Sequence, residues 1–555
     1  MLHACRISLG IIVTLLLVQS SIGQKGNANF SSLCEDVRKE MILRDPSLEN
    51  NTNLECRSSY ELEKPPALSI SISVSECLER CPGYEASKHN VLNQWIGPLV
   101  GFLLPALAFV ISIPRPIRLP RHERWFAARK LVAYSWLVLA MGLMLLDILF
   151  WIIAVFAFAG PLVAGSIHEA FVDHMVLGYA EKNISSDPST ALLAISFTLV
   201  GSLQPHEGDL SGNIYAYILD SPFGKQKLRS LLALLPSYGA RVGVPIVFYL
   251  GAYAYALFDA KSKLGDNDTA HAVAFGLWYG VVVIVAIVSS AVLGIDNPAS
   301  LEAILSENIE LEPFLASENS EALKSPSRSS EPKSYHFHSS IFRTVWLWER
   351  ARVFQEWSRK NSVDASVSAY IKASTPRVIS GLLASVLIAL PCAGACWISY
   401  STPMVGFGCR STVHLIYATS QIILILVWWL YYSSPTRILA KQKGKNCTES
   451  AIAVYALAAM ALAAAIISSI GGTIMQLVGV FKNCICKASL KYLLPGSRAG
   501  GMVSLANDMQ EHRDNARWWI IVGSIGVAFV GLVAVASWAY QTRVRQRCLA
   551  LINRL

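Results

Sequence analysis

The chain has 555 residues, of which 53% are hydrophobic and 15% are charged, and its mean hydropathy is +0.43. Soluble domains carry about a quarter charged residues, so the composition predicts a protein of the membrane class. The formal net charge of +9 comes from basic residues beside apolar runs, and without a zinc-finger or RNA-binding signature it predicts no nucleic-acid partner.

Residues 1–23 predict a secretory signal peptide. Arg6 supplies the positive charge, Ile7 to Val18 form the apolar core, and small residues precede Gln24. The core is too short to favour the alternative, an uncleaved anchor helix. We therefore expect cleavage before Gln24, with the mature chain starting outside a plasma membrane or secretory-pathway membrane.

Residues 24–92 form a polar segment that we predict to be a small glycosylated ectodomain. It contains four cysteines, Cys34, Cys56, Cys77 and Cys81, and glycosylation sequons at Asn29 and Asn50. Cysteines behind a signal peptide indicate an oxidising compartment, and two disulfides among these four allow three connectivities. We interpret the segment as a disulfide-stapled cap, with ligand binding as the alternative.

Eight apolar runs are long enough to span a bilayer. They lie at 95–113, 131–158, 237–258, 271–294, 376–400, 411–433, 450–479 and 517–540. The signal peptide places the loop 114–130 inside, and its basic residues agree. The basic loop 434–448 and the basic tail 541–555 should also be cytoplasmic, and an outside start with an inside end requires an odd number of crossings.

We therefore expect a ninth span at 189–204, which is uncharged but short. The predicted fold class is an all-α polytopic transmembrane helix bundle of about nine spans, with bundle halves at 93–294 and 376–540. The sequon at Asn183 would face outside. The alternative is a helix on the outer face at 189–204, which keeps eight spans and inverts everything after about position 260.

The long polar segment 295–375 is predicted to be a cytoplasmic disordered loop that offers a regulatory partner or a kinase a site at Ser325-Pro326. An amphipathic helix should follow, with Phe342, Trp346 and Trp357 on one face. Such a helix lies on the anionic leaflet or packs under the bundle.

Ionisable residues inside spans are candidates for function. Asp147 and Arg241 are the two that we single out, as a possible intramembrane polar pair. The stretch "HEAFVDH" at 168–174 resembles a zinc-protease motif, but its histidines are six residues apart instead of four. We interpret it as a solvated acidic helix end, and we expect no metal site, no cofactor and no enzyme.

Cysteines beyond the ectodomain also predict disulfides. Cys409 is expected to pair with Cys392 or Cys396, and Cys484 and Cys486 are expected to form a disulfide with another outer loop. The span at 450–479 is rich in Ala, Gly and Ser, which predicts a central position in the bundle.

The stretch "GDNDTAHA" at 265–272 precedes the span that begins at 271. It contains a formal sequon at Asn267, too near the bilayer for us to expect modification. Asp268 or Thr269 is expected to cap the helix that follows, where acids also suit the helix dipole. The alternative is a weak cation site formed by Asp266, Asp268 and His271.

The pieces "GDNDTAHAVAFGLW", "NPASLEAIL", "FRTVWLWERARVFQEW" and "GFGCRSTVHLIY" lie between about 265 and 417. In these pieces the chain resembles a group of uncharacterised multi-pass membrane proteins of filamentous fungi. The resemblance implies a fungal protein of the secretory pathway or cell surface and assigns no activity. We expect a non-enzymatic scaffold or sensor, with a transporter or channel that uses Asp147 and Arg241 as the alternative.

Overall fold

The computed structural model describes residues 28–57, 63–88, 92–113, 130–201, 203–205, 224–262, 267–294, 374–402, 406–433, 449–488, 501–506 and 508–555, with a few positions between 300 and 350. The predicted signal peptide, the loops 114–129 and 434–448, Ser325 and Asp266 lie outside these residues.

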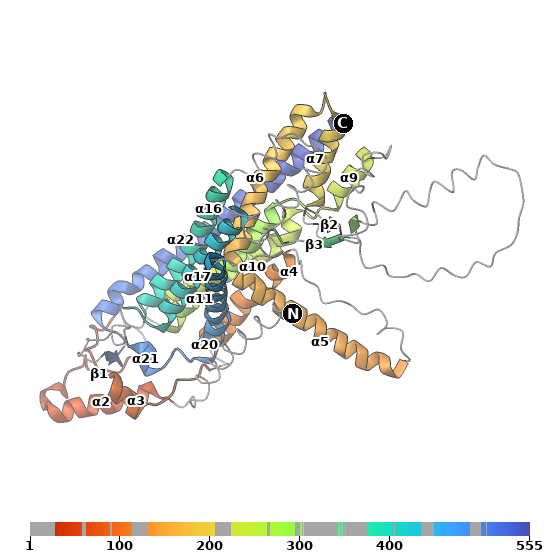
Figure 1. Ribbon diagram of the computed structural model, residues 1–555. Coiled ribbons are helices and arrows are strands. Elements are labelled where there is room, and N and C mark those ends of the chain that lie inside the picture. Colours follow the sequence, from red (N-terminus) through yellow and green to blue (C-terminus); the bar gives the residue numbers. More distant parts are fainter. Residues whose placement is uncertain are drawn as a thin grey trace, which may run out of the picture.

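The described chain is almost entirely helical (Figure 1). Its first part contains α2 (Phe30–Arg44), a short 3₁₀ turn η1 (Pro46–Leu48) and α3 (Val74–Arg80). The bundle follows with η2 (Leu92–Leu103), α4 (Leu104–Ser112), α5 (Lys130–Ala157), α6 (Ala159–Asn183), α7 (Pro188–Val200), α9 (Gly224–Leu234), η4 (Gly239–Gly243), α10 (Val244–Ser262), α11 (Asn267–Ala291), α16 (Ser374–Tyr400), α17 (Cys409–Ser433), α19 (Glu449–Ile466), η8 (Ile467–Gly471), α20 (Gly472–Val478), α21 (Cys484–Lys487) and α22 (Gln510–Arg554).

Six helices in the described residues are long and apolar enough to cross a membrane, and a seventh span results if the bent pair α5–α6 counts as one. This supports an integral membrane protein, while the predicted count of nine spans is not confirmed. The expected ninth span is α7, a helix of 13 residues. At 1.5 Å per residue it is about 20 Å long, too short for the hydrocarbon core.

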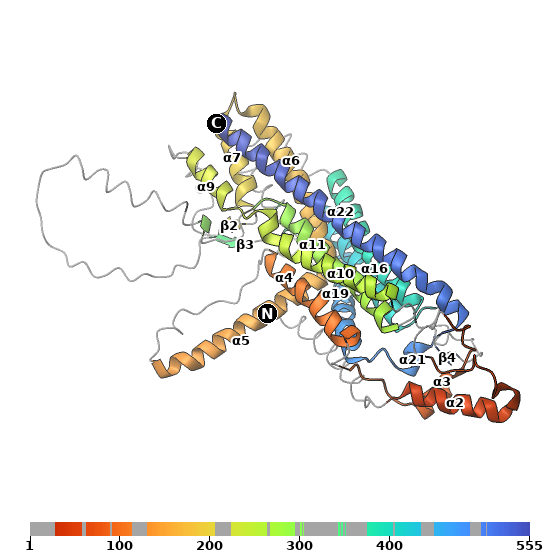
Figure 2. The same ribbon diagram turned by 180° about the vertical axis from the view of Figure 1, so that it is seen from behind.

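Helix α11 lies at the centre of the bundle, where α4, α6, α10, α16 and α22 surround it (Figures 1 and 2). Its apolar window is wholly buried, whereas only 22% of the window 452–478 is. The prediction of a central 450–479 span is therefore wrong. Small residues do allow close packing, as at Gly276 and Gly280 of α11, where an added Cβ would lie 2.7 Å from Phe102 and 2.8 Å from Tyr249 respectively.

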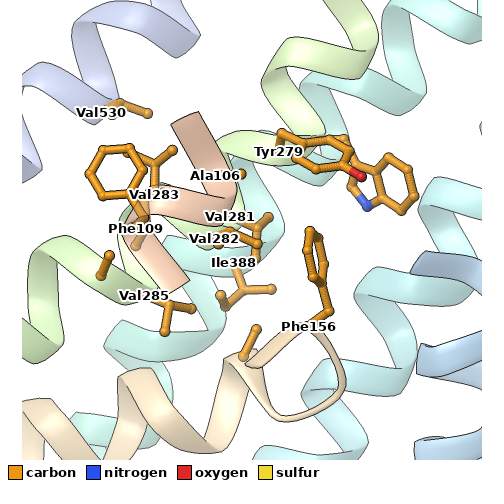
Figure 3. Close-up of a cluster of buried hydrophobic side chains, with 14 of the residues drawn as sticks. Ala106, Phe109, Phe156, Tyr279, Val281, Val282, Val283, Val285, Ile388 and Val530 are labelled. Carbon is orange, nitrogen blue, oxygen red and sulfur yellow. The ribbon is translucent and has the colours of Figure 1, made fainter. Parts of the chain in front are cut away.

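Apolar side chains of α4, α5, α16 and α22 pack around the middle of α11 (Figure 3). We call this group the apolar layer, and it comprises Ala106, Phe109, Phe156, Tyr279, Val281, Val282, Val283, Val285, Ile388 and Val530. β-Branched residues dominate it because their stiff side chains fill space at little entropic cost. The layer separates the two ends of the bundle.

Helix α22 connects these two ends (Figure 2). It has 45 residues and is therefore about 68 Å long. Its first residues meet the segment 28–88, where Arg57 donates to Asp508 at 2.9 Å, and we call this the outer end. Its last residues meet α6, α7 and α9, and we call that the inner end.

The ectodomain is stapled within itself by one disulfide and is joined to distant parts of the chain by a second disulfide and a strand pair. Strand β1 (Ser71–Ser73) pairs antiparallel with β4 (Met502–Ser504). Disulfides link Cys34 to Cys56, Cys77 to Cys484 and Cys409 to Cys486. Two disulfides among the first four cysteines were expected, but Cys77 leaves the segment for Cys484 and Cys81 keeps a buried free thiol.

The expected partner of Cys409 is also corrected. Cys392 is a buried thiol inside α16 and Cys396 points to the carbonyl of Ser411, so neither pairs with it. Cys484 and Cys486 do form disulfides to other segments, as predicted, because the turn at α21 brings them beneath α3 and beside the start of α17.

Candidate functional site

A small polar pocket lies at the outer end of the bundle, where α11, α16, α17 and α20 meet. It is lined by His271, Ala274, Phe275, Trp278, Ser399, Arg410, Val413, His414, Gly472, Gln476 and Phe481. The free volume is about 10 Å³, close to the space of one water-sized group. Arg410 and Gln476 are partly exposed, so the pocket is not sealed.

Arg410 is the cation of this pocket. Its Nη1 lies 2.8 Å from Nε2 of His271, its Nε donates to Oε1 of Gln476 at 2.8 Å, and its guanidinium stands 5.3 Å from the centre of the Phe481 ring. Both polar partners are neutral. The carboxylate of Asp268 also acts electrostatically on Arg410, although it pairs directly with Lys482 at 2.8 Å.

Four buried polar atoms of the pocket have no hydrogen-bond partner in the described structure: Nδ1 of His271, Nε1 of Trp278, Oγ of Ser399 and Nδ1 of His414. Their side chains belong to residues that are 2% to 6% exposed. Because Arg410 can only donate, Nε2 of His271 accepts and its Nδ1 carries the proton. A buried donor without an acceptor costs about 1–3 kcal/mol, so this cluster is not explained by the fold alone.

The acidic stretch before the pocket proves to be its rim. Asp268 lies in the first turn of α11, as expected for an acid at a helix start. Its carboxylate pairs with Nζ of Lys482 at 2.8 Å and accepts a hydrogen bond from Gln94 at 2.7 Å. His271 turns instead to Arg410. Since basic side chains face both residues, the alternative of a cation site finds no support in this geometry.

Two disulfides hold the roof of the pocket. Cys409 stands directly before Arg410 and binds Cys486, while the neighbouring Cys484 binds Cys77 of the ectodomain. From the opposite side, Gly472 lets α20 approach α17 and α11, because a Cβ there would lie 2.8 Å from Val413 of α17 and 3.3 Å from Trp278 of α11. The pocket is thus fixed between a covalent cap and a close helix contact.

The inner end carries a second buried polar group, which we call the inner charge cluster. Arg350 has no exposed surface and lies 2.9 Å from Asp173 and 3.6 Å from Glu169. It also donates to the carbonyls of Leu293 and Thr198, at 3.1 Å each. Arg350 comes from the segment 342–357 that we expected to lie on the membrane or under the bundle.

The stretch "HEAFVDH" is therefore not a solvated helix end. His168, Glu169 and Asp173 are at most 1% exposed. The segment that supplies Arg350 begins as a strand, since β3 (Phe342–Thr344) pairs with β2 (Leu203–Pro205), so Phe342 does not belong to the predicted helix face. Trp346 packs between Trp151 and Phe158, which favours the packing alternative.

The other predicted site residues lie apart from the pocket. Asp147 is on α5 and Arg241 is in η4, both are partly exposed, and their pairing stays a prediction. Asn29 and Asn50 are exposed in the ectodomain. Asn183 ends α6 near Glu181, whose carboxylate pairs with Arg547 at 2.6 Å, so Asn183 lies at the inner end.

Arg410, His414 and Gln476 were missed at the sequence level. Arg410 stands at the outer end of an apolar run, against the tendency of basic residues to flank the inner ends, and His414 follows one helical turn later. These two features were the available signal. Gln476 carries no charge and belongs to no recognised motif. Only the fold brings it to the site.

Groups of three or more metal-binding side chains are absent from the part of the chain that the structure describes. Comparison of the chain with protein-family models, with curated proteins and with solved structures finds no match.

Proposed function

We propose that this integral membrane protein is a sensor of the cell surface or secretory pathway. Its outer pocket binds a small ligand beneath the stapled ectodomain, and the bundle relays occupancy to the inner charge cluster. The observation that carries this proposal is the group of buried, unpartnered polar atoms around Arg410. A pure scaffold gains nothing from leaving such donors unsatisfied, whereas a binding site needs them.

Coupling between the ends has a physical route. Helix α22 begins at the ectodomain contact of Asp508 and ends beside the inner charge cluster, where Tyr540 donates to the carbonyl of Ala170 at 2.8 Å. Helix α11 carries the pocket residue His271 in its second turn and ends near Ser290, whose carbonyl accepts from Gln541 of α22 at 3.0 Å. Both helices therefore run from the outer part of the bundle to its inner end, where they contact each other.

A secondary transporter or channel is the second candidate. The π-helical turn η8 before Gly472 interrupts the span 452–478, and broken helices line the sites of many transporters. The apolar layer argues against it, because α11 carries no polar side chain between Tyr279 and Val285. Asp147 and Arg241 remain the residues that this alternative would use.

The sensor proposal is tested through Cys548, a fully buried thiol on α22 at the inner end. In the purified full chain, Arg410→Gln should change the alkylation rate of Cys548, read by peptide mass spectrometry, at least about threefold. The matched control is Arg517→Gln, which changes an exposed arginine near the outer end of α22. It should leave the rate unchanged.

An unchanged Cys548 rate in a folded Arg410→Gln protein would contradict the sensor proposal and leave the scaffold. Flux of an ion or solute through reconstituted vesicles, lost in Asp147→Asn, would establish the transporter instead. Since Asp147 lies on α5 rather than at the pocket, the two variants separate these outcomes.

A further inference from the structure

We propose that the outer pocket binds a compact anionic acceptor, either a halide or one oxygen of a carboxylate. This inference rests on the proposed function in that it names the ligand class of the same pocket. It is carried by the charge and by the donor chemistry of the residues that line the pocket.

The charge of the pocket is positive. The charges of the two rim residues, Asp268 and Lys482, cancel each other, since the carboxylate and the ammonium lie 2.8 Å apart. Arg410 then remains as the only charged residue that lines the pocket in the described structure, and its polar partners His271 and Gln476 are neutral groups. Asp268 acts electrostatically on Arg410 but pairs directly with Lys482, so the partly buried guanidinium favours a further anion beside it.

The unpartnered atoms are of the type that an anion needs. The indole Nε1 of Trp278 can only donate, and Nδ1 of His271 is a donor because its Nε2 faces Arg410. The hydroxyl of Ser399 can rotate to donate, and Nδ1 of His414 completes the set. A cation in the pocket would face three hydrogen-bond donors and a positively charged guanidinium. This lining therefore excludes a cation.

The size of the pocket limits the occupant. A free volume of about 10 Å³ accepts one water-sized group. A water is the competing occupant, but it brings two protons of its own, which would point toward a lining that offers mostly donors. A halide or a carboxylate oxygen brings acceptor capacity alone and gains from charge-assisted hydrogen bonds.

The test uses thermal unfolding of the purified full chain in detergent at constant ionic strength, with chloride or acetate replacing the bulky sulfonate HEPES. We expect a saturable rise of a few degrees in the midpoint with at least one of the two anions. A response to chloride alone identifies a halide site, and a response to acetate alone identifies a carboxylate site.

Two variants tie the response to the pocket. Trp278→Phe keeps the aromatic ring and removes the Nε1 donor, so it should weaken the apparent affinity about tenfold. Arg410→Gln should abolish the response. The matched control is Trp518→Phe, an indole on the outer turn of α22 that is 39% exposed, and it should titrate like the unaltered protein.

The absence of a saturable response to either anion, or an equal response in Trp278→Phe and in the unaltered protein, would overturn the anion site and leave a water in the pocket. This failure is distinct from that of the sensor proposal. Anion binding without any change at Cys548 would keep the site and refute the sensor, whereas a Cys548 response without anion binding would do the reverse.

Discussion

At the scale of single residues, a buried carboxylate adds to the disulfide and the strand pair that join the ectodomain to the bundle. Asp508 has no exposed surface and accepts from Arg57 at 2.9 Å and from two nitrogens of Arg513 at 2.6 Å each. Burial alone would lower the pKa of Arg57, but its hydrogen bonds to Asp508 and Glu55 raise it.

Replacing Asp508 with Asn should destabilise this contact by about 3 kcal/mol, because Arg57 would remain buried without its main counter-ion. The measurement is the temperature at which residues 28–88 lose protease resistance in the detergent-purified chain. Asp514→Asn, which changes an exposed carboxylate on the same helix, is the control. Equal midpoints for the two variants would contradict a structural role for Asp508.

Lys487 makes the ectodomain contact dependent on pH. Its Nζ lies 3.8 Å from the centre of the Phe30 ring, and burial lowers its pKa to about 8 from 10.5. Between these values the unfolded chain keeps the proton that the folded chain releases, so stability should rise as the pH increases from about 8 towards 10.5. Below pH 8 both states are protonated and this dependence ends.

Unfolding midpoints measured from pH 7 to 9.5 check this sign. The unaltered chain should gain stability above about pH 8, and Lys487→Met should flatten the profile in that range. A midpoint that falls equally in both proteins over the same range would show that Lys487 does not govern the pH dependence.

At the scale of elements, the break between α5 and α6 is the feature least visible in the sequence. The two helices meet at 77°, and the junction is buried against the middle of α17. Gln421 donates to the carbonyls of Phe156 and Ala157, at 3.1 and 3.2 Å, and accepts from the amide of Gly160 at 2.8 Å. Irregular backbone inside a membrane protein requires such internal partners.

Gln421→Leu should therefore destabilise the bundle by about 2–3 kcal/mol, since it leaves two carbonyls and one amide with fewer partners. Tyr417, which donates to the carbonyl of Phe156 at 2.9 Å, limits the loss. The thermal midpoint in detergent is the readout, with Thr419→Ala as the control on the exposed face of α17. A loss no greater than that of Thr419→Ala would argue that the junction does not depend on Gln421.

Helix positions were predictable because apolar runs of fixed length report the bilayer directly. The runs at 376–400, 411–433 and 517–540 correspond to α16, α17 and α22. Partners of buried polar groups were not, because Gln421, Arg410 and Arg350 each bind residues more than a hundred positions away, and local periodicity carries no information on that distance. The number of crossings stays unconfirmed, and the α5–α6 bend, where Gln421 binds three backbone groups, could not be read from local periodicity either.

At the scale of the whole molecule, the two ends differ in chemistry. Three disulfides lie at the outer end, and the arginines of the tail lie at the inner end, where Arg545 donates to the carbonyls of Leu232 and Leu235. This polarity agrees with an outside ectodomain and a cytoplasmic tail. It also separates the predicted glycan acceptors, because Asn29 and Asn50 lie at one end and Asn183 at the other.

Glycosylation mapping tests this polarity. Single Asn→Gln variants at 29 and 50 should each increase the electrophoretic mobility of the expressed protein, and Asn183→Gln should not, because its side chain lies with the tail. Treatment with a glycosidase should remove the difference among the proteins. A glycan found on Asn183 would mean that the inner end is luminal, and the assignment of the two ends would have to be reversed.

The link between Cys77 and Cys484 has a consequence for how the protein is made. The two cysteines are 407 residues apart, so at about 5–20 residues per second the ribosome needs roughly 20–80 s to produce the second after the first. During that interval the thiols of Cys77 and Cys81 stand four residues apart in an oxidising compartment. The Cys77 thiol of the nascent ectodomain must therefore stay reduced, or leave a provisional disulfide by exchange, until nearly the whole chain has been inserted.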